Sequence, residues 1–182
     1  MSTTDGRPES ASRGYRFELS HKDCGAPLLN VLGGKLTSYR QLAEKGLDLL
    51  ASGLPGLGPA WTSTASLPGG DFPIDGAPKL AEDLQRDYPF LPPSDVLRIS
   101  RAYGTDARHW LGSARTWGDL GRSYGAGLTE AEVGWMREQE WAESAEDVLW
   151  RRSKLGLRVD CSGQKRLSED LLSFKVSGHV TR

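Results

Sequence analysis

A lysine beside two glycines is the clearest chemical feature of this sequence. The residues Gly-Gly-Lys at 33–35 stand between a short apolar run, residues 28–32, and the start of a helical pattern. The start of a helix presents backbone N–H groups without partners in the helix, together with the positive end of the helix dipole. Glycine lets a ligand approach the backbone closely, and Lys35 adds a full positive charge. The stretch therefore predicts a site for an anion or for an electron-rich carbonyl edge.

Two common nucleotide-binding motifs do not fit this stretch. The phosphate-binding pattern G-x-x-x-x-G-K-[ST] requires glycine where Leu29 stands and serine or threonine where Leu36 stands. The dinucleotide-binding pattern G-x-G-x-x-G does not occur in the sequence. A strand-to-helix turn that contains glycine is also commonly only a turn. The residues alone leave a ligand site and a structural turn both open.

The flanking residues predict two strands and a helix around the turn. Residues 15–19 alternate apolar and polar side chains, as in a half-buried strand. Residues 28–32 are mostly apolar, as in a strand buried on both faces. Ser38 with Gln41 predicts a capping box at the helix start, and Gly53 an end. The face that this helix is expected to bury consists of Tyr39, Leu42, Ala43, Gly46, Leu47 and Leu50.

The rest of the sequence predicts a helical domain. Gly104 is expected to end one helix, and Thr129 with Glu132 predicts a second capping box. The helix that follows is expected to point three side chains toward a core, namely Val133, Met136 and Trp141. The predicted fold class is mainly α, a small helix bundle of about five or six helices preceded by a β-hairpin and βα unit. The expected division is a disordered tail over 1–12, a βα part over 13–53, a linker over 54–77 and a helical domain over 78–182.

Composition and charge exclude several classes of protein. A net charge of -1 over 182 residues gives no reason to expect a nucleic-acid partner. No apolar run approaches the ~20 residues that cross a bilayer, and residues 1–19 lack the apolar core of a signal peptide. Cys24 and Cys161 lie far apart and the three histidines show no metal-ligand spacing, so neither a zinc site nor a disulfide framework is predicted. We expect a cytoplasmic protein, with attachment to a membrane surface left open.

Two other features have structural explanations. In the stretch "WRRSK", a patch for anionic lipids is one option, but the spacing favours an ion pair between Arg151 and Asp147, one helical turn back. The six tryptophans are expected in the core or in packing between domains. We assign no chemistry to either feature.

Longer stretches of the chain resemble the FAD-dependent, aerobic glycerol-3-phosphate dehydrogenases. The stretch "APLLNVLGGKLTSYRQLAEKGLDLL" is similar to the last strand-to-helix junction of that family's flavin domain, and "GPAWTSTASLPGGDF" to its interdomain connection. The stretches "ISRAYGTDARHWLG", "DLGRSYGAGLTEAEVGWMREQEWA" and "SAEDVLWRRSKLGL" are similar to parts of its helical C-terminal domain. The resemblance runs in order from Ser12 to Leu172.

The resemblance implies an activity and a set of site residues. In this family FAD takes a hydride from C2 of glycerol 3-phosphate, giving dihydroxyacetone phosphate, and the electrons pass to a membrane quinone. The residues implied to lie against the flavin are Gly33, Gly34, Lys35, Leu36 and Thr37. Arg13, in an "SRGY" segment where the family has S/T-R-D-Y, is implied to grip the substrate phosphate, because a guanidinium can bond two oxygens at once. Lys35 is expected to contact the substrate as well.

The resemblance also implies that this chain is the C-terminal part of such an enzyme, from a split, truncated or misannotated gene. We expect the chain alone to be inactive and to bind FAD weakly or not at all, because the pyrophosphate and adenosine anchors belong to the missing part. An N-terminal partner polypeptide would complete the enzyme, and peripheral association with the inner face of the cell membrane and a homodimer are further expectations. Two alternatives stay open: a non-catalytic helical module for interactions, and an oxidase that passes electrons to oxygen.

Overall fold

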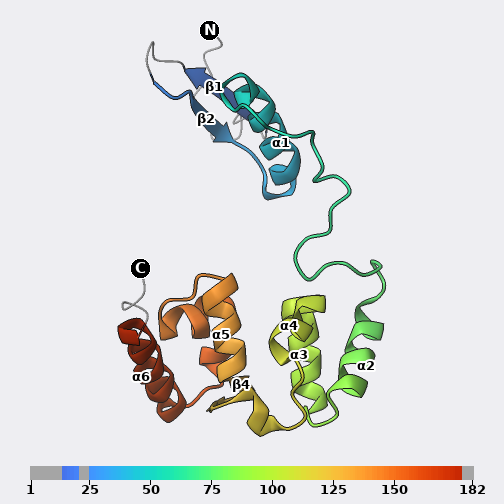
Figure 1. Cartoon of the computed structure of the whole chain (residues 1–182), viewed down its shortest axis with the longest axis vertical. Helices are drawn as coiled ribbons and strands as arrows, with labels where there is room; N and C mark the ends of the chain where they lie inside the picture. Colours follow the sequence, from blue (N-terminus) through green and yellow to red (C-terminus); the bar gives the residue numbers. More distant parts are fainter. Residues whose placement is uncertain (1–13, 21–24, 178–182) are drawn as a thin grey trace, which may run out of the picture. The chain divides into compact units, whose positions relative to one another are not determined.

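The computed structural model describes residues 14–20 and 25–177, with side chains described through residue 173. The chain forms two compact units, one within residues 1–66 and the other within residues 67–182. Figure 1 shows a hairpin and one helix in the first unit and a set of short helices in the second. Arg13, Cys24, His21 and His179, whose roles the sequence raised, lie outside the described residues.

The first unit is an antiparallel hairpin covered on one face by a helix. Strand β1 (Tyr15–Ser20) pairs with β2 (Leu28–Gly33) in a register that places Tyr15 opposite Gly33. A short 3-10 helix, η2 (Leu36–Ser38), leads into α1 (Tyr39–Leu50), and η3 (Ala51–Gly53) ends it. At Gly46, α1 packs closely against the hairpin, because a Cβ there would lie 3.3 Å from Leu29 and 3.6 Å from Phe17. The alternating pattern of β1 thus predicted its half-buried face correctly.

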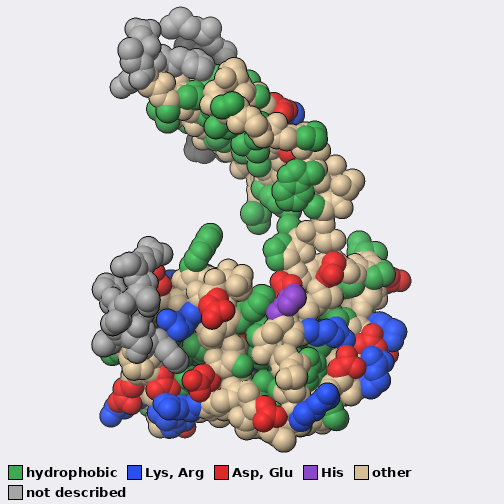
Figure 2. Space-filling model, viewed as in Figure 1, with side chains coloured by type: hydrophobic (Ala, Val, Ile, Leu, Met, Phe, Trp, Pro, Cys, Tyr) green, Lys and Arg blue, Asp and Glu red, His purple; other side chains and the backbone are tan. Residues whose placement is uncertain are grey.

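The prediction that β2 is buried on both faces is wrong for the described residues. Leu28 and Leu32 lie on the hairpin face away from α1, and they are 59% and 43% exposed. The described sheet has only these two strands, so nothing in it covers that face. Figure 2 shows hydrophobic side chains gathered over this unit. β2 therefore carries more apolar side chains than this unit buries.

The second unit confirms the prediction of a mainly helical fold. Its longer helices are α2 (Ala77–Asp87), α3 (Pro93–Tyr103), α4 (Ala107–Leu111), α5 (Glu130–Gln139) and α6 (Cys161–Ser177). Short 3-10 turns are η4 (Gly104–Asp106), η5 (Trp117–Leu120) and η7 (Leu155–Leu157), and η6 (Asp147–Arg152) is a π-helical segment. A small hairpin, β3 (Ser123–Gly125) with β4 (Leu128–Thr129), was not predicted. It lies between η5 and α5 in the chain.

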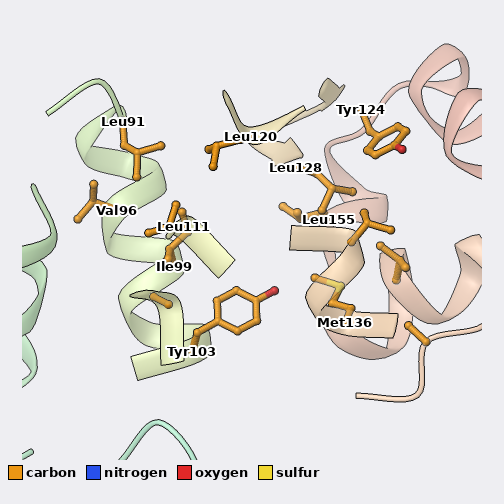
Figure 3. Close-up of a cluster of buried hydrophobic side chains, with 14 of the residues drawn as sticks. Leu91, Val96, Ile99, Tyr103, Leu111, Leu120, Tyr124, Leu128, Met136 and Leu155 are labelled. Carbon is orange, nitrogen blue, oxygen red and sulfur yellow. The ribbon is translucent and has the colours of Figure 1, made fainter. Parts of the chain in front are cut away.

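One core of buried side chains connects these elements (Figure 3). Val133 and Met136 of α5 are 1% and 0% exposed, which confirms their predicted burial. Trp141 is 83% exposed, so its prediction as a core residue is wrong. The reason is that α5 ends at Gln139 and Trp141 adopts a positive φ of 55°, which takes it off the helical face. The core residues labelled in Figure 3 are Leu91, Val96, Ile99, Tyr103, Leu111, Leu120, Tyr124, Leu128, Met136 and Leu155.

A charged side chain lies in the middle of this core. Glu132 is fully buried, and the guanidinium of Arg98 donates to its two oxygens at 2.6 and 2.8 Å. The Tyr103 hydroxyl donates to the same carboxylate at 2.7 Å. The predicted capping box between Thr129 and Glu132 is therefore wrong: Thr129 does precede α5, but its buried hydroxyl has no hydrogen-bond partner among the described residues. Leaving a buried carboxylate without a charged partner costs more free energy than leaving a helix end without a cap.

Candidate functional site

The Gly-Gly-Lys turn between β2 and η2 is shaped by its two glycines. Gly33 and Gly34 both have positive φ, 78° and 109°, a conformation that side chains with a Cβ rarely adopt. The N–H of Gly34 donates to the carbonyl oxygen of Gly14 at 3.2 Å. A Cβ at Gly33 would lie 2.9 Å from that same oxygen. The turn therefore requires glycine for backbone reasons, and both glycines are exposed to solvent.

Lys35 and Ser38 fix the start of the helix. Lys35 is extended, with φ −97° and ψ 151°, and precedes η2. The Ser38 hydroxyl accepts from the N–H of Lys35 at 3.2 Å and donates to its carbonyl oxygen at 2.8 Å. The predicted capping box of Ser38 with Gln41 is thus wrong, because Ser38 turns back toward Lys35 rather than forward into α1. Helix formation begins three residues earlier than α1 itself.

The site is open to solvent. All five predicted flavin-contacting residues, 33–37, are exposed, and Leu36 is 90% exposed. As the first residues of η2, Leu36 and Thr37 have N–H groups for which the helix itself supplies no acceptor. The side chain of Lys35 is exposed beside them. The arrangement can place a positive charge and two N–H donors against an anion or a carbonyl oxygen.

The structure brings together the five residues of the turn but leaves one predicted site residue untested. Arg13, predicted to grip the substrate phosphate, lies outside the described residues. Its neighbour in the chain, Gly14, is hydrogen bonded to Gly34. Gly14 was not predicted to be part of this turn. Its position there follows from the hairpin register, which places Tyr15 opposite Gly33 and which no local sequence pattern specifies.

Aromatic and basic side chains lie close to the turn. A Cβ at Gly34 would contact Leu42 at 3.1 Å and Tyr15 at 3.8 Å. The ammonium group of Lys45 lies 5.6 Å from the centre of the Tyr15 ring. A cation at this distance is attracted by the ring. Lys45 therefore contributes to holding α1 against β1, next to the turn.

Comparison with known proteins decides the family. Residues 60–169 match the family model described as the C-terminal domain of alpha-glycerophosphate oxidase, which is more than half of the chain. The chain belongs to this family. The match covers most of the helical unit and begins after the Gly-Gly-Lys turn.

Longer relatives also match the turn. The chain is 40% identical over 167 residues to the aerobic glycerol-3-phosphate dehydrogenase of Escherichia coli K12, covering 92% of this chain and 33% of that protein. It is 44% identical over 166 residues to the glycerol-3-phosphate dehydrogenase of Pseudomonas aeruginosa, covering 91% and 32%. It is 40% identical over 149 residues to the D-erythritol 1-phosphate dehydrogenase of Brucella abortus, covering 82% and 30%. Matches of the first two lengths necessarily include residues 33–37, and the chain spans about a third of the length of these relatives.

Two kinds of site are not seen in the described part of the chain. No helix there is both long and apolar enough to cross a membrane. Among the same residues, no group of three or more His, Cys, Asp or Glu side chains is arranged to hold a metal ion. The turn at residues 33–37 remains the candidate site.

Proposed function

We propose that this chain serves as the C-terminal part of a flavoprotein that oxidises glycerol 3-phosphate to dihydroxyacetone phosphate and passes the electrons to a quinone. The main support is an exposed Gly-Gly-Lys turn at the head of a helix, in a chain 40–44% identical to two glycerol-3-phosphate dehydrogenases. A cytoplasmic location with peripheral attachment to the inner face of the cell membrane suits a quinone acceptor, which is dissolved in the membrane. The remaining two thirds of the relatives' length would come from an N-terminal partner polypeptide or from the rest of a longer chain.

The residues of the turn fit FAD as cofactor. Gly33 and Gly34 are exposed and carry no side chain, so a flat ring can approach their backbone closely. When bound, FAD supplies the hydride acceptor, and negative charge develops along the N1 and C2-carbonyl edge of its ring. The N–H groups of Leu36 and Thr37, with the Lys35 ammonium, would stabilise that charge. FAD would thus be held partly here and mainly by the part of the enzyme that this chain does not span.

Two positive side chains would hold the substrate. Arg13 would bind the phosphate of glycerol 3-phosphate with its planar fork of N–H donors. Lys35 would contact the substrate as well as the cofactor, because a flexible ammonium at the turn can reach either. Orientation by these two charges would place C2 for hydride removal.

A chimeric enzyme tests the proposal. This chain would replace the corresponding C-terminal third of the Pseudomonas aeruginosa relative, and the purified chimera would be assayed for reduction of a soluble quinone analogue. We expect FAD-dependent activity with glycerol 3-phosphate, and less with D-erythritol 1-phosphate. A folded chimera that retains FAD but is inactive would contradict the proposal.

Two other functions are tested by the same samples. An oxidase is favoured by the name of the matching family model, and it would produce hydrogen peroxide in the assay without a quinone. A non-catalytic module is favoured by the helical unit, whose core closes within residues 67–182. For the chain alone we expect weak or no FAD binding. A stoichiometric yellow colour retained after desalting would contradict that expectation.

A further inference from the structure

A cleft on the helical unit has no role in the proposed reaction. It has a volume of about 450 Å³, and three segments line it: the residues before α2, the η4–α4 segment, and the C-terminal end of α5. This volume is in the range of sites for small ligands or for a side chain of a partner. The lining residues are Pro68, Asp106, His109, Trp135, Gln139 and Glu140.

One wall of the cleft is aromatic. The imidazole of His109 and the indole of Trp135 are parallel within 2°, with ring centres 5.8 Å apart. His109 is exposed, whereas Trp135 is half-buried against the core. The exposed imidazole is therefore stacked on the half-buried indole, which holds its orientation from below. A planar group can stack on the open face of the imidazole at little entropic cost, because that ring is already held in place.

The charged groups of the cleft are mainly carboxylates. Asp106 lies 3.9 Å from the Nε2 of His109, and its side chain is 25% exposed. Burial raises the pKa of Glu140, and the charge of Arg152 and a hydrogen bond with Trp135 only partly oppose that rise. The Nε of Arg152 donates to the main-chain carbonyl of Glu140 at 2.7 Å, so this guanidinium also binds the main chain. Among the described residues that line the cleft are two carboxylates and no lysine or arginine, so the cleft is negative.

Other ligand classes fit the cleft less well. An anion would be repelled by Asp106 and Glu140. A metal ion would need at least three suitable ligands, and no such group occurs in the described part of the chain. A flat cation satisfies both the stacking surface and the carboxylates, because a guanidinium stacks on aromatic rings and bonds carboxylates with its N–H groups.

We propose that this cleft binds a guanidinium group, which stacks on the open face of the His109 imidazole and forms ion pairs with Asp106 and Glu140. The group would come either from a free arginine-type molecule or from an arginine side chain of a polypeptide. The site is independent of the flavin assignment, since every lining residue belongs to the helical unit.

NMR titration of the full chain at pH 8 tests this proposal. The indole N–H signal of Trp135, assigned by its loss in Trp135→Phe, is followed as arginine methyl ester is added. We expect saturable shifts with a dissociation constant of roughly 0.1–10 mM. Citrulline methyl ester has nearly the same shape without the charge, and it should cause no such shifts. Equal binding of the two esters, or no saturation with the arginine ester, would overturn the proposal.

Variants and a second ligand complete the experiment. Glu140→Gln and Asp106→Asn should each weaken binding of the arginine ester by about fivefold or more, because each removes one ion pair. Glu138→Gln, in α5 two residues before Glu140 but outside the cleft, should leave binding unchanged. A capped Gly-Arg-Gly peptide that binds as well as the ester would assign a polypeptide side chain as the source, and failure of the peptide alone would assign a free molecule. If either cleft variant folds poorly, the comparison of the two esters on the unmodified chain still tests whether the cleft binds a guanidinium group.

Discussion

Gly69 and Gly104 meet backbone to backbone, and this contact attaches the segment before α2 to the end of α3. A Cβ on Gly104 would overlap the carbonyl oxygen of Gly69, and a Cβ on Gly69 would overlap the carbonyl oxygen of Tyr103. The N–H of Thr105 donates to the Gly69 oxygen at 3.0 Å, and its hydroxyl donates to Asp71. The segment that leads into the helical unit is thus a fixed part of it.

Substitution of Gly104 tests this contact. Gly104 has φ 57° and ψ −132°, and Gly112 has nearly the same conformation, φ 53° and ψ −131°, but a Cβ on Gly112 would have no atom within 4 Å. Gly112→Ala should lower the free energy of unfolding by about 1–3 kcal/mol through backbone strain alone. Gly104→Ala should lower it by a further ~2 kcal/mol or more, because a packed backbone has to move as well. Urea unfolding followed by far-UV circular dichroism measures both, and equal losses would show that the contact is not rigid.

The buried pair of Arg98 and Glu132 provides a second prediction. Arg98→Met leaves the Glu132 carboxylate buried with only the Tyr103 hydroxyl, and we expect a loss of ~3–5 kcal/mol in the free energy of unfolding. Glu169→Gln removes a charge from an exposed pair with Lys165 and should change stability by no more than about 0.5 kcal/mol. Chemical denaturation compares the two variants. A loss for Arg98→Met as small as that of the control would mean that the pair adds nothing to stability.

The acid stability of the helical unit depends in part on Asp147. Hydrogen bonds from the Ser144 hydroxyl, from the N–H groups of Glu143 and Ser144, and from Arg151 lower the pKa of Asp147 from 3.8 to about 2. Because the folded pKa is below the unfolded one, this stabilisation is complete above pH 4 and is lost as the pH falls toward 2. The melting temperature of Asp147→Asn should therefore lie below that of the unmodified chain at pH 5, and the gap should narrow at pH 2.5.

A direct measurement accompanies that comparison. The carboxyl carbon of Asp147 can be titrated by NMR in the folded chain. A midpoint near 3.8 would contradict the prediction, as would a gap in melting temperature that does not change with pH.

Exposed leucines on the hairpin predict association of the isolated chain. Leu28 and Leu32 lie on a face that no described residue of the sheet or of α1 covers, and unpaired strand edges with apolar side chains promote pairing between chains. Leu32→Lys should shift the light-scattering mass toward a monomer. Leu172→Lys, at a leucine 65% exposed on α6, is the matched control and should have little effect. A dilute unmodified chain that remains strictly monomeric would count against the prediction.

Local periodicity predicted the parts of the fold that depend on neighbours in the chain. It identified the buried side chains Val133 and Met136, the helix end at Gly104 and the ion pair of Arg151 with Asp147, at 2.9 Å. Each of these depends on spacings of a few residues, which the sequence displays directly.

Contacts between segments far apart in the chain could not be predicted from local spacing. Glu132 has the spacing of a capping residue, but its partner Arg98 lies 34 residues away, and nothing local indicates the pair. The exposure of Trp141 follows from a single positive φ after the end of α5. At the candidate site, the two glycines indicated the turn, whereas its contact with Gly14 follows only from the pairing of β1 with β2.

The proposed role of the η2 N–H groups in stabilising the reduced flavin is tested most directly by removing one of them. Leu36 is the first residue of η2, where proline is well tolerated, and the extended Lys35 before it suits a proline that follows. In the chimeric dehydrogenase, Leu36→Pro deletes the N–H but keeps the turn, whereas Leu36→Ala keeps both. We expect a fall of roughly 10²-fold in kcat for Leu36→Pro and little change for Leu36→Ala. Equal kcat values for the two variants, with FAD bound in both, would contradict it.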